Sequence, residues 1–232
     1  MTDQVPYSIP GLNSSIIRRS ASTWGDGGLW EDILRLSGLF WAAETEVDGR
    51  LSWHHLVLAV GNFKRQPGRR LRPAALTTIK MLPTGVKSEI SIPVQRSPLT
   101  LKCSDLHTWK DLSLALPGSA VATTTSLLAA LWPDCHFIFD WRVHAAANGL
   151  RIAHGEPPTA DVDPDSVAPA SETFEAYVEV RDWVLETADC LNTETWEVER
   201  ALYGLSQRVS DSDNRTWRQY GEQLTDLLHR PQ

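Results

Sequence analysis

The sequence predicts a mainly α-helical protein, and two features of the chain carry that prediction. Apolar residues recur at the 3.6-residue period of an amphipathic helix along most of the chain, whereas strand-like alternation appears only near residues 89–95. In addition, 42% of the 232 residues are hydrophobic, so the chain can bury a core without metals or disulfides. The three cysteines are odd in number and far apart, which favours a reducing cytoplasm as location.

The N-terminal part divides into a flexible arm over residues 1–28 and a helical region over residues 29–98. The arm lacks a sustained period and contains at most a short helix near Ile16. The helical region holds three predicted helices. The first has an apolar stripe and ends before Asp48-Gly49, the second is capped by Ser52 and ends at Gly61-Asn62, and the third follows Pro73. Apolar alternation near Pro93 predicts one minor edge strand.

Residues 99–232 are predicted to form a second helical domain. One helix ends before Pro117-Gly118, a second stops at Pro133, and a third starts at Asp140 and ends near Gly149. A Pro-rich loop at 155–171 has no apolar period, which indicates a surface segment that a packed core does not use. Ser171 is the expected cap of the next helix, and a last helix runs from Asn192-Thr193 to Gly204.

Charge is distributed unevenly along the chain. Residues 1–110 carry 14 Lys/Arg against 9 Asp/Glu, and residues 111–232 carry 8 against 20. The basic residues are densest between Lys64 and Arg72, a stretch that includes Arg69, Arg70 and Arg72. Such a cluster can neutralise nucleic-acid phosphates, although a solvated loop has the same composition.

One segment combines features that point to chemistry. A helix, the turn Leu116-Pro117-Gly118-Ser119-Ala120, a second helix and the apolar run Phe137-Ile138-Phe139 lead to Asp140-Trp141-Arg142-Val143. This order resembles the helix-hairpin-helix superfamily of DNA glycosylases, in which a Leu-Pro-Gly-x-Gly hairpin precedes an aspartate followed by Arg-Val. Residues 177–203 resemble the closing helices of bacterial proteins with the 8-oxoguanine-glycosylase fold. The resemblance covers about residues 100–210 and implies a glycosylase-like helical bundle.

The resemblance implies roles for several residues. Asp140 would be catalytic, by stabilising the cationic sugar of a flipped-out nucleotide or by orienting water. Gly118, Ser119 and Ala120 in the hairpin, together with Arg142 and the basic cluster, would bind DNA, and Trp141 would line the base pocket. The residues also have simpler interpretations: Asp140 as a helix cap, Arg142 as an ion-pair partner, and most tryptophans as core residues.

Two departures from the family pattern refine the functional prediction. Ala120 stands where the family has its second hairpin glycine, which weakens or rearranges the approach to a phosphate. No lysine lies near Ala122, where bifunctional members place the amine that attacks the sugar. The implied activity is therefore base release by a monofunctional DNA N-glycosylase without lyase activity. The alternative is a catalytically inactive module of this fold that binds DNA or a protein partner in a bacterial defence or repair system. An unrelated helical protein is a third interpretation.

Other classes of protein find no support in the sequence. No apolar run approaches the roughly 20 residues that a bilayer-spanning helix needs, so no membrane association is expected. The histidines show no metal-ligand spacing, and phosphate-loop, dinucleotide-binding and nucleophile-elbow motifs do not occur. We therefore expect no cofactor and no metal.

Overall fold

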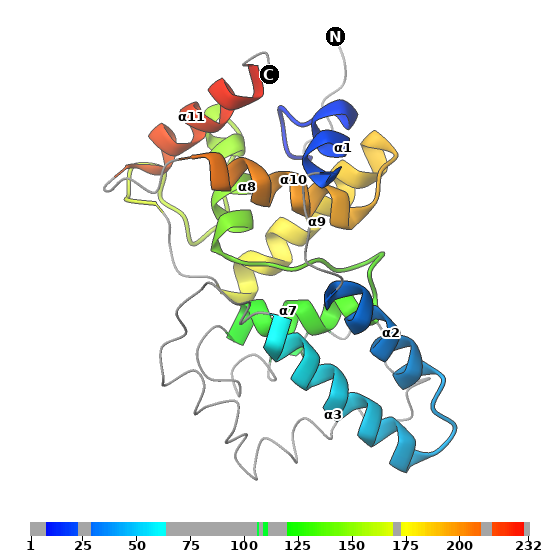
Figure 1. Cartoon of the computed structure of the whole chain (residues 1–232). Helices are drawn as coiled ribbons and strands as arrows, with labels where there is room; N and C mark the ends of the chain where they lie inside the picture. Colours follow the sequence, from blue (N-terminus) through cyan, green and yellow to red (C-terminus); the bar gives the residue numbers. More distant parts are fainter. Residues whose placement is uncertain are drawn as a thin grey trace. The chain divides into compact units, whose positions relative to one another are not determined.

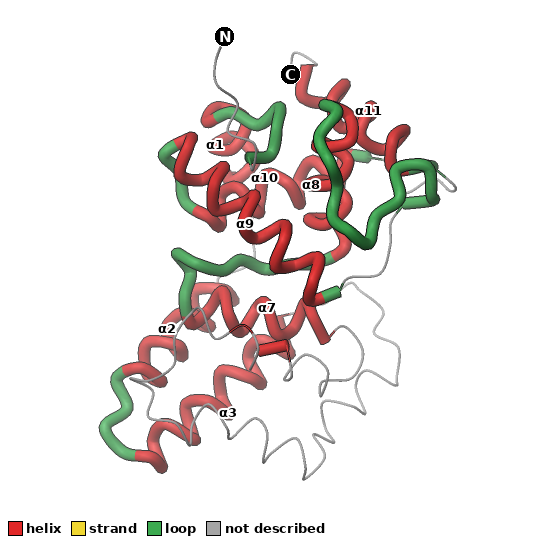
Figure 2. The backbone as a smooth tube through the Cα atoms, turned by 180° about the vertical axis from the view of Figure 1, so that it is seen from behind, coloured by secondary structure: helices red, strands yellow, loops and turns green. Residues whose placement is uncertain are grey.

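The described part of the chain is helical, as the sequence predicts. The computed structural model describes residues 8–22, 29–63, 106, 109–110, 120–168, 173–209 and 215–229. Its helices are α1 (Ser14–Ser22), α2 (Leu29–Trp41), α3 (Glu46–Phe63), α7 (Ala120–Leu131), α8 (Trp141–Ala153), α9 (Phe174–Leu191), α10 (Thr195–Arg208) and α11 (Trp217–His229) (Figure 1). Within these ranges the only β pairing is an isolated bridge between Val167 and Thr216, so no strand interrupts the helices in the backbone trace (Figure 2). The strand expected at 89–95 and the helix expected after Pro73 lie outside the described residues.

The chain divides into two compact units. One unit combines Met1–Trp24 with Asp134–Gln232, and the other comprises Gly25–Pro133. The boundary expected near residue 98 therefore differs from this division, because α7 groups with α2 and α3.

The Gly25–Pro133 unit packs α2, α3 and α7 together. Helix α3 begins at Glu46, six residues before the cap expected at Ser52. The reason is Thr45: its hydroxyl oxygen accepts the Asp48 N–H at 3.1 Å, and its carbonyl accepts the Gly49 N–H at 3.0 Å. Thr45 with an acid three residues later is a helix-start pattern, so Asp48-Gly49 lies inside the helix instead of ending the previous one.

Aromatic side chains fill the core of this unit. Phe40 contacts Trp41 and Trp53, Trp109 contacts Trp53 and Trp132, and Trp41 contacts Trp132 at 5.5 Å between ring centroids. We call these five residues, Phe40, Trp41, Trp53, Trp109 and Trp132, the aromatic cluster. The Trp41 indole also donates to the Leu131 carbonyl at the end of α7 at 3.3 Å. The core role expected for Trp53 is met, since its side chain is 1% exposed.

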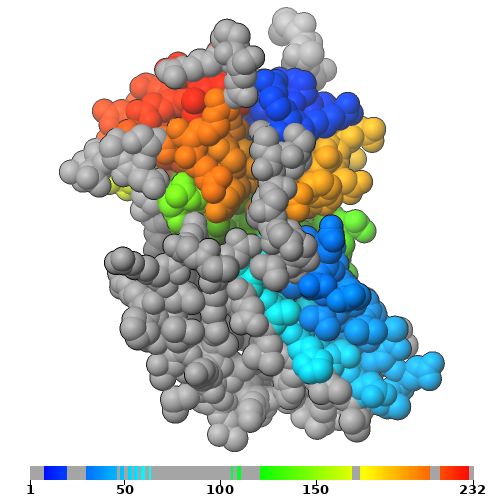
Figure 3. Space-filling view, in the orientation of Figure 1, coloured from blue at the N-terminus to red at the C-terminus, as the bar shows by residue number. Residues whose placement is uncertain are grey.

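The other unit is built around α8. Ten consecutive residues of this helix, from Val143 to Ile152, are buried. Helices α9, α10 and α11 contact α8, and α1 packs on α10. Figure 3 shows one face of this unit in space-filling form, with α1 in blue and α10 in orange. Helix α8 continues to Ala153, beyond the end expected near Gly149.

Gly149 is inside α8 because it lies where another helix approaches closely. A Cβ atom on Gly221 of α11 would lie 2.1 Å from the Gly149 carbonyl oxygen. A Cβ atom on Gly149 would lie 3.3 Å from the Gly221 Cα atom. The two glycines therefore let α8 and α11 touch backbone to backbone. Helix α11 has no counterpart in the elements expected from the sequence.

The described part of the N-terminal arm is packed rather than loose. Ile17 is completely buried, Ile9 is 2% exposed, and the Ile9 N–H donates to the Thr187 hydroxyl on α9 at 2.8 Å. The short helix expected near Ile16 is present as α1. Ile17 of α1 and Ile9 before the helix are buried, which the irregular sequence around them does not reveal.

Candidate functional site

The candidate site begins with the extended segment that precedes α8. Side chains from α9 and α10 form hydrogen bonds with this segment, two with its backbone carbonyls and one with the side chain of His136. The Thr195 hydroxyl donates to the Asp134 carbonyl at 3.2 Å, Arg181 Nε donates to the Cys135 carbonyl at 2.8 Å, and the Tyr177 hydroxyl lies 2.5 Å from His136 Nδ1. These contacts fix the direction from which the chain enters α8.

Tyr177 is the centre of the apolar packing under this segment. Its ring lies 5.6 Å from that of Phe137 and 5.5 Å from that of Phe139, and its side chain is completely buried. Burial raises the pKa of Tyr177 far above its ordinary value, so the phenol stays neutral beside His136. The apolar run that the sequence analysis placed before Asp140 is thus an anchor in the core.

Asp140 is the N-cap of α8. Its Oδ1 atom accepts the N–H groups of Arg142 at 3.0 Å and Val143 at 3.3 Å, and its carbonyl accepts the His144 N–H at 3.0 Å. The residue is half-buried. Its second carboxylate oxygen, Oδ2, accepts no hydrogen bond from any residue in the described ranges. The expected helix start at Asp140 is therefore confirmed, and one oxygen of its carboxylate stays unengaged.

Trp141 and Arg142 lie beside this carboxylate and contact each other. The Arg142 guanidinium carbon is 4.2 Å from the centroid of the Trp141 ring, a cation–π geometry. Arg142 Nη1 also lies 3.5 Å from the Ser206 carbonyl near the end of α10, where a helix terminus favours a cation. Both residues are half-buried. Arg142 therefore has a structural contact that the sequence did not reveal.

The structure does not place the remaining predicted DNA-binding residues relative to Asp140. Gly118, Ser119, Arg69, Arg70 and Arg72 lie outside the described residues. Ala120 is the first residue of α7, in the unit that comprises Gly25–Pro133. Their roles stay predictions.

A feature that sequence reasoning missed is a polar stripe on the buried helix α8, formed by His144, Asn148 and Arg151. The spacing of four and three residues puts these side chains on one face, and that spacing is the signal that could have identified them. All three are at most 3% exposed. Polar groups at that depth need hydrogen-bond partners, and the loop that follows α8 supplies them.

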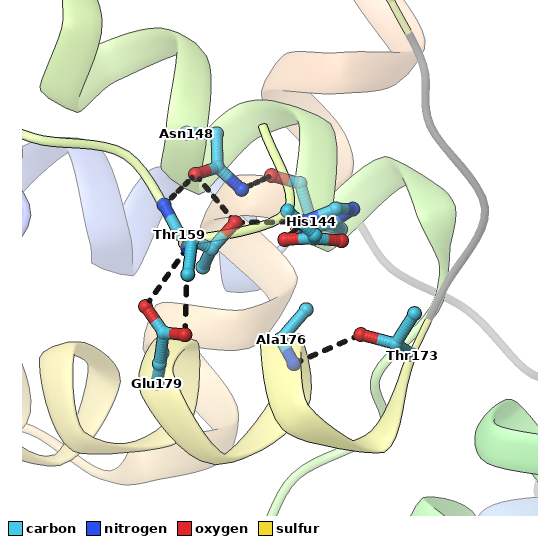
Figure 4. A network of polar contacts seen from close by, with 8 residues as sticks. His144, Asn148, Thr159, Thr173, Ala176 and Glu179 are labelled. Carbon is cyan, nitrogen blue, oxygen red and sulfur yellow. Dashed lines mark hydrogen bonds and ion pairs between the residues drawn. The ribbon is translucent and has the colours of Figure 1, made fainter. Parts of the chain in front are cut away.

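The loop at 154–168 is the partner of the polar stripe. Asn148 Oδ1 accepts the Thr159 N–H at 2.7 Å and the Thr159 hydroxyl at 3.1 Å, and the Thr159 hydroxyl lies 3.3 Å from His144 Nε2 (Figure 4). Arg151 Nε donates to the Pro157 carbonyl at 2.8 Å. Because Thr159 is 1% exposed and Val162 is 6% exposed, the expectation that the core does not use this loop is wrong for these positions.

The end of the loop also differs from the sequence expectation. Helix α9 is capped by Thr173, whose hydroxyl oxygen accepts the Ala176 N–H at 3.0 Å (Figure 4). The expected cap, Ser171, lies outside the described residues. Glu179 of α9 accepts the Ala160 N–H of the loop at 3.3 Å.

Burial dominates the electrostatics of the polar stripe. It lowers the pKa of His144 below its ordinary value, and the carboxylate of Asp161, with Oδ1 3.8 Å from His144 Nε2, acts weakly in the opposite direction. Burial also lowers the pKa of Arg151, with Glu156 opposing. At His144 burial outweighs the attraction of Asp161, because Asp161 is 28% exposed and solvent screens its charge.

Protein-family models, curated proteins and solved structures yield no match to the chain. In the described residues, no group of three or more His, Cys, Asp or Glu side chains is arranged to hold a metal ion. None of the helices in those ranges has both the length and the apolarity that crossing a bilayer requires.

Proposed function

We propose that the protein is a monofunctional DNA N-glycosylase that removes an altered base with Asp140. The observation that supports this best is the state of the Asp140 carboxylate. One oxygen is held by two backbone N–H groups at the start of α8, while the other has no partner among the described residues and the residue is half-buried. A positioned carboxylate with one unengaged oxygen is what stabilisation of a sugar cation needs.

Capping and catalysis are compatible at this position. A helix N-terminus carries partial positive charge and free N–H groups, so α8 holds the Asp140 side chain in place by hydrogen bonds. As the bond between base and sugar breaks, the base leaves with the bonding electrons and the sugar becomes cationic. Water then adds to the sugar carbon and loses one proton, and the departing base takes up one proton, so the step balances. The α7 sequence contains no lysine, so no Schiff base is expected.

The test is base release from oligonucleotides that carry deaminated, oxidised or alkylated bases. We expect abasic sites that break only after alkali, and no covalent complex after borohydride treatment. Asp140→Ser and Asp140→Asn keep a capping side chain but remove the charge, so both should abolish release while helix content is unchanged. Asp134→Asn, an exposed aspartate in the same segment, is the matched control and should keep full activity. Activity in both Asp140 variants would make Asp140 a cap only.

A second candidate function is a non-catalytic module that binds DNA or a protein partner. The observation that bears on it is the contact of Arg142 with the Ser206 carbonyl: an arginine held by α10 is less available to a phosphate, which favours a protein partner. In this case no base is released. Replacing Arg69, Arg70 and Arg72 by Ala should then weaken DNA binding and reduce its salt dependence. If the native protein has no affinity for single- or double-stranded DNA at low salt, a protein partner is the remaining interpretation.

A further inference from the structure

The contacts of His144 define which ring nitrogen carries the proton. The Asn148 side chain is oriented by two backbone groups, since its Nδ2 donates to the His144 carbonyl at 3.0 Å and its Oδ1 accepts the Thr159 N–H. The Thr159 hydroxyl therefore donates its single proton to Asn148 Oδ1, 3.1 Å away. Its oxygen can then only accept from His144 Nε2, so neutral His144 carries its proton on Nε2.

The other ring nitrogen of His144 has no place for a proton. Nδ1 is buried and has no hydrogen-bond partner in the described part of the chain. The ring is completely buried between the rings of Phe139 and Trp217, at centroid distances of 5.5 and 5.6 Å. A second proton would place an unsatisfied N–H and a positive charge in this apolar surrounding.

The charged groups around His144 do not offset that cost. The loop contributes the partly exposed Asp161, which faces Nε2 and not Nδ1. Glu179 of α9 is bonded to the Ala160 N–H of the loop, and α11 contacts the ring with the uncharged indole of Trp217. Consistent with this, burial lowers the pKa of His144 in the folded protein.

We propose that His144 is a proton-operated clasp that holds residues 158–163 onto α8 when neutral and releases them when protonated. Release exposes the ring to water, where it takes up the second proton at its ordinary affinity. The far end of the loop stays attached by two backbone hydrogen bonds. The backbone N–H of Trp217 donates to the Ser166 carbonyl at 3.1 Å, and the backbone N–H of Ala168 donates to the Arg215 carbonyl at 2.9 Å. Neither bond involves a titrating group. The opening is therefore local and independent of any activity at Asp140.

The test is hydrogen exchange of single amides, followed by NMR at pH 7.5 and pH 5.5 and corrected for the intrinsic exchange rate. The Thr159 amide, bonded to Asn148, reports the clasp. An open state that titrates with an ordinary histidine pKa of about 6.5 becomes about tenfold more populated over this interval if the closed state does not titrate. We expect the protection of Thr159 to fall by about that factor, while the Trp217 amide keeps its protection.

Two variants distinguish loop release caused by protonation of His144 from a general loss of structure at low pH. In His144→Gln the side-chain amide can still donate to the Thr159 hydroxyl but does not titrate, so the pH dependence at Thr159 should disappear. His154→Gln, which replaces an exposed histidine just after the same helix, should behave like the native protein. Equal Thr159 protection at both pH values in the native protein, or pH dependence that persists in His144→Gln, would overturn the proposal. If His144→Gln does not fold, a direct NMR titration of His144 decides: a pKa at or above 6.5 contradicts it.

Discussion

The aromatic cluster and the polar stripe fill two helical cores in different ways. In the aromatic cluster, ring area supplies the stabilisation, and the indole N–H groups of Trp53 and Trp109 are buried without a partner in the described residues. Along the polar stripe, both polar atoms of the Asn148 side chain have partners: Oδ1 accepts from Thr159 of the loop, and Nδ2 donates to the His144 carbonyl of α8. The same fold class can therefore be stabilised by contact between large apolar rings in one helical core and by directional hydrogen bonds in another.

The two kinds of core make different demands on sequence. Large rings tolerate changes that keep their volume, because dispersion and burial depend little on orientation. A hydrogen-bonded side chain tolerates almost none, because each lost partner leaves a buried polar group unsatisfied. Substitutions that keep volume or keep hydrogen bonding should therefore distinguish the two.

The largest effect is expected in the aromatic cluster. Trp53→Ala should lower the free energy of unfolding by about 4 kcal/mol, because it removes a large buried side chain and leaves a cavity. Trp53→Phe, the matched variant, should cost less than half as much, because it keeps most of the ring and removes an unsatisfied N–H. Denaturant unfolding measures both. Equal losses would mean that the indole N–H has a partner after all.

The next largest effect is expected at the contact between α8 and α11. Gly221→Ala should destabilise the protein by about 3 kcal/mol, because its methyl group would overlap the Gly149 carbonyl and push the two helices apart. Gly38→Ala is the control: a Cβ there meets nothing within 4 Å, and alanine is the better helix former, so stability should rise by about 0.5 kcal/mol. If α8 and α11 approach as closely as the structure shows, thermal unfolding should give a lower melting temperature for Gly221→Ala and a higher one for Gly38→Ala.

A smaller loss is expected in the polar stripe. Asn148→Ala removes the acceptor of the Thr159 N–H and hydroxyl and should cost about 2 kcal/mol. Asn148→Asp keeps the acceptor oxygen but cannot donate to the His144 carbonyl, and a charge in this buried site also needs compensation. Both variants should increase exchange of the Thr159 amide more than that of the Trp217 amide. Equal increases at the two amides would place the effect outside the stripe.

The smallest effect is expected from pH. Because the pKa of His144 is lowered in the folded state, the unfolded chain binds more protons than the folded one below the unfolded value of about 6.5. The stability contributed by neutral His144 is therefore present above pH 6.5 and is lost progressively as pH falls toward the folded pKa. The loss is about 1.4 kcal/mol per pH unit where only the unfolded state is protonated. Native protein should show this slope in denaturant midpoints, and His144→Gln should lack it.

Sequence periodicity identified the helices whose buried faces are apolar. Helix α7 ends before Pro133 as expected, and α9 carries Phe174 and Tyr177 on its buried side as expected. Periodicity did not predict the ends of a helix that is buried on all sides, or of one whose ends depend on contacts with residues far along the chain. Gly149 appeared to end α8 because a glycine normally weakens a helix, and only its neighbour Gly221 explains why it does not.

The candidate site was predictable only in part for the same reason. The position of Asp140 at a helix start follows from local sequence. The partners of Arg142 and His144 do not, because Ser206 and Thr159 are brought to them by tertiary packing. The Pro-rich composition of the loop correctly predicted irregular backbone, but composition carries no information about the single threonine that anchors it.

The pairing of Ser8 and Ile9 with residues far along the chain has a consequence for how the protein is made. Ile9 is hydrogen-bonded across 178 residues, and Arg151 Nη1 donates to the Ser8 carbonyl across 143 residues. At about 5 to 20 residues per second, a ribosome needs about 10 to 35 seconds to synthesise the 178 residues between Ile9 and Thr187. Residues 25–133 emerge during that wait and can fold first. Until Thr187 emerges, the buried side chains of Ile9 and Ile17 are exposed to chaperones and to neighbouring nascent chains.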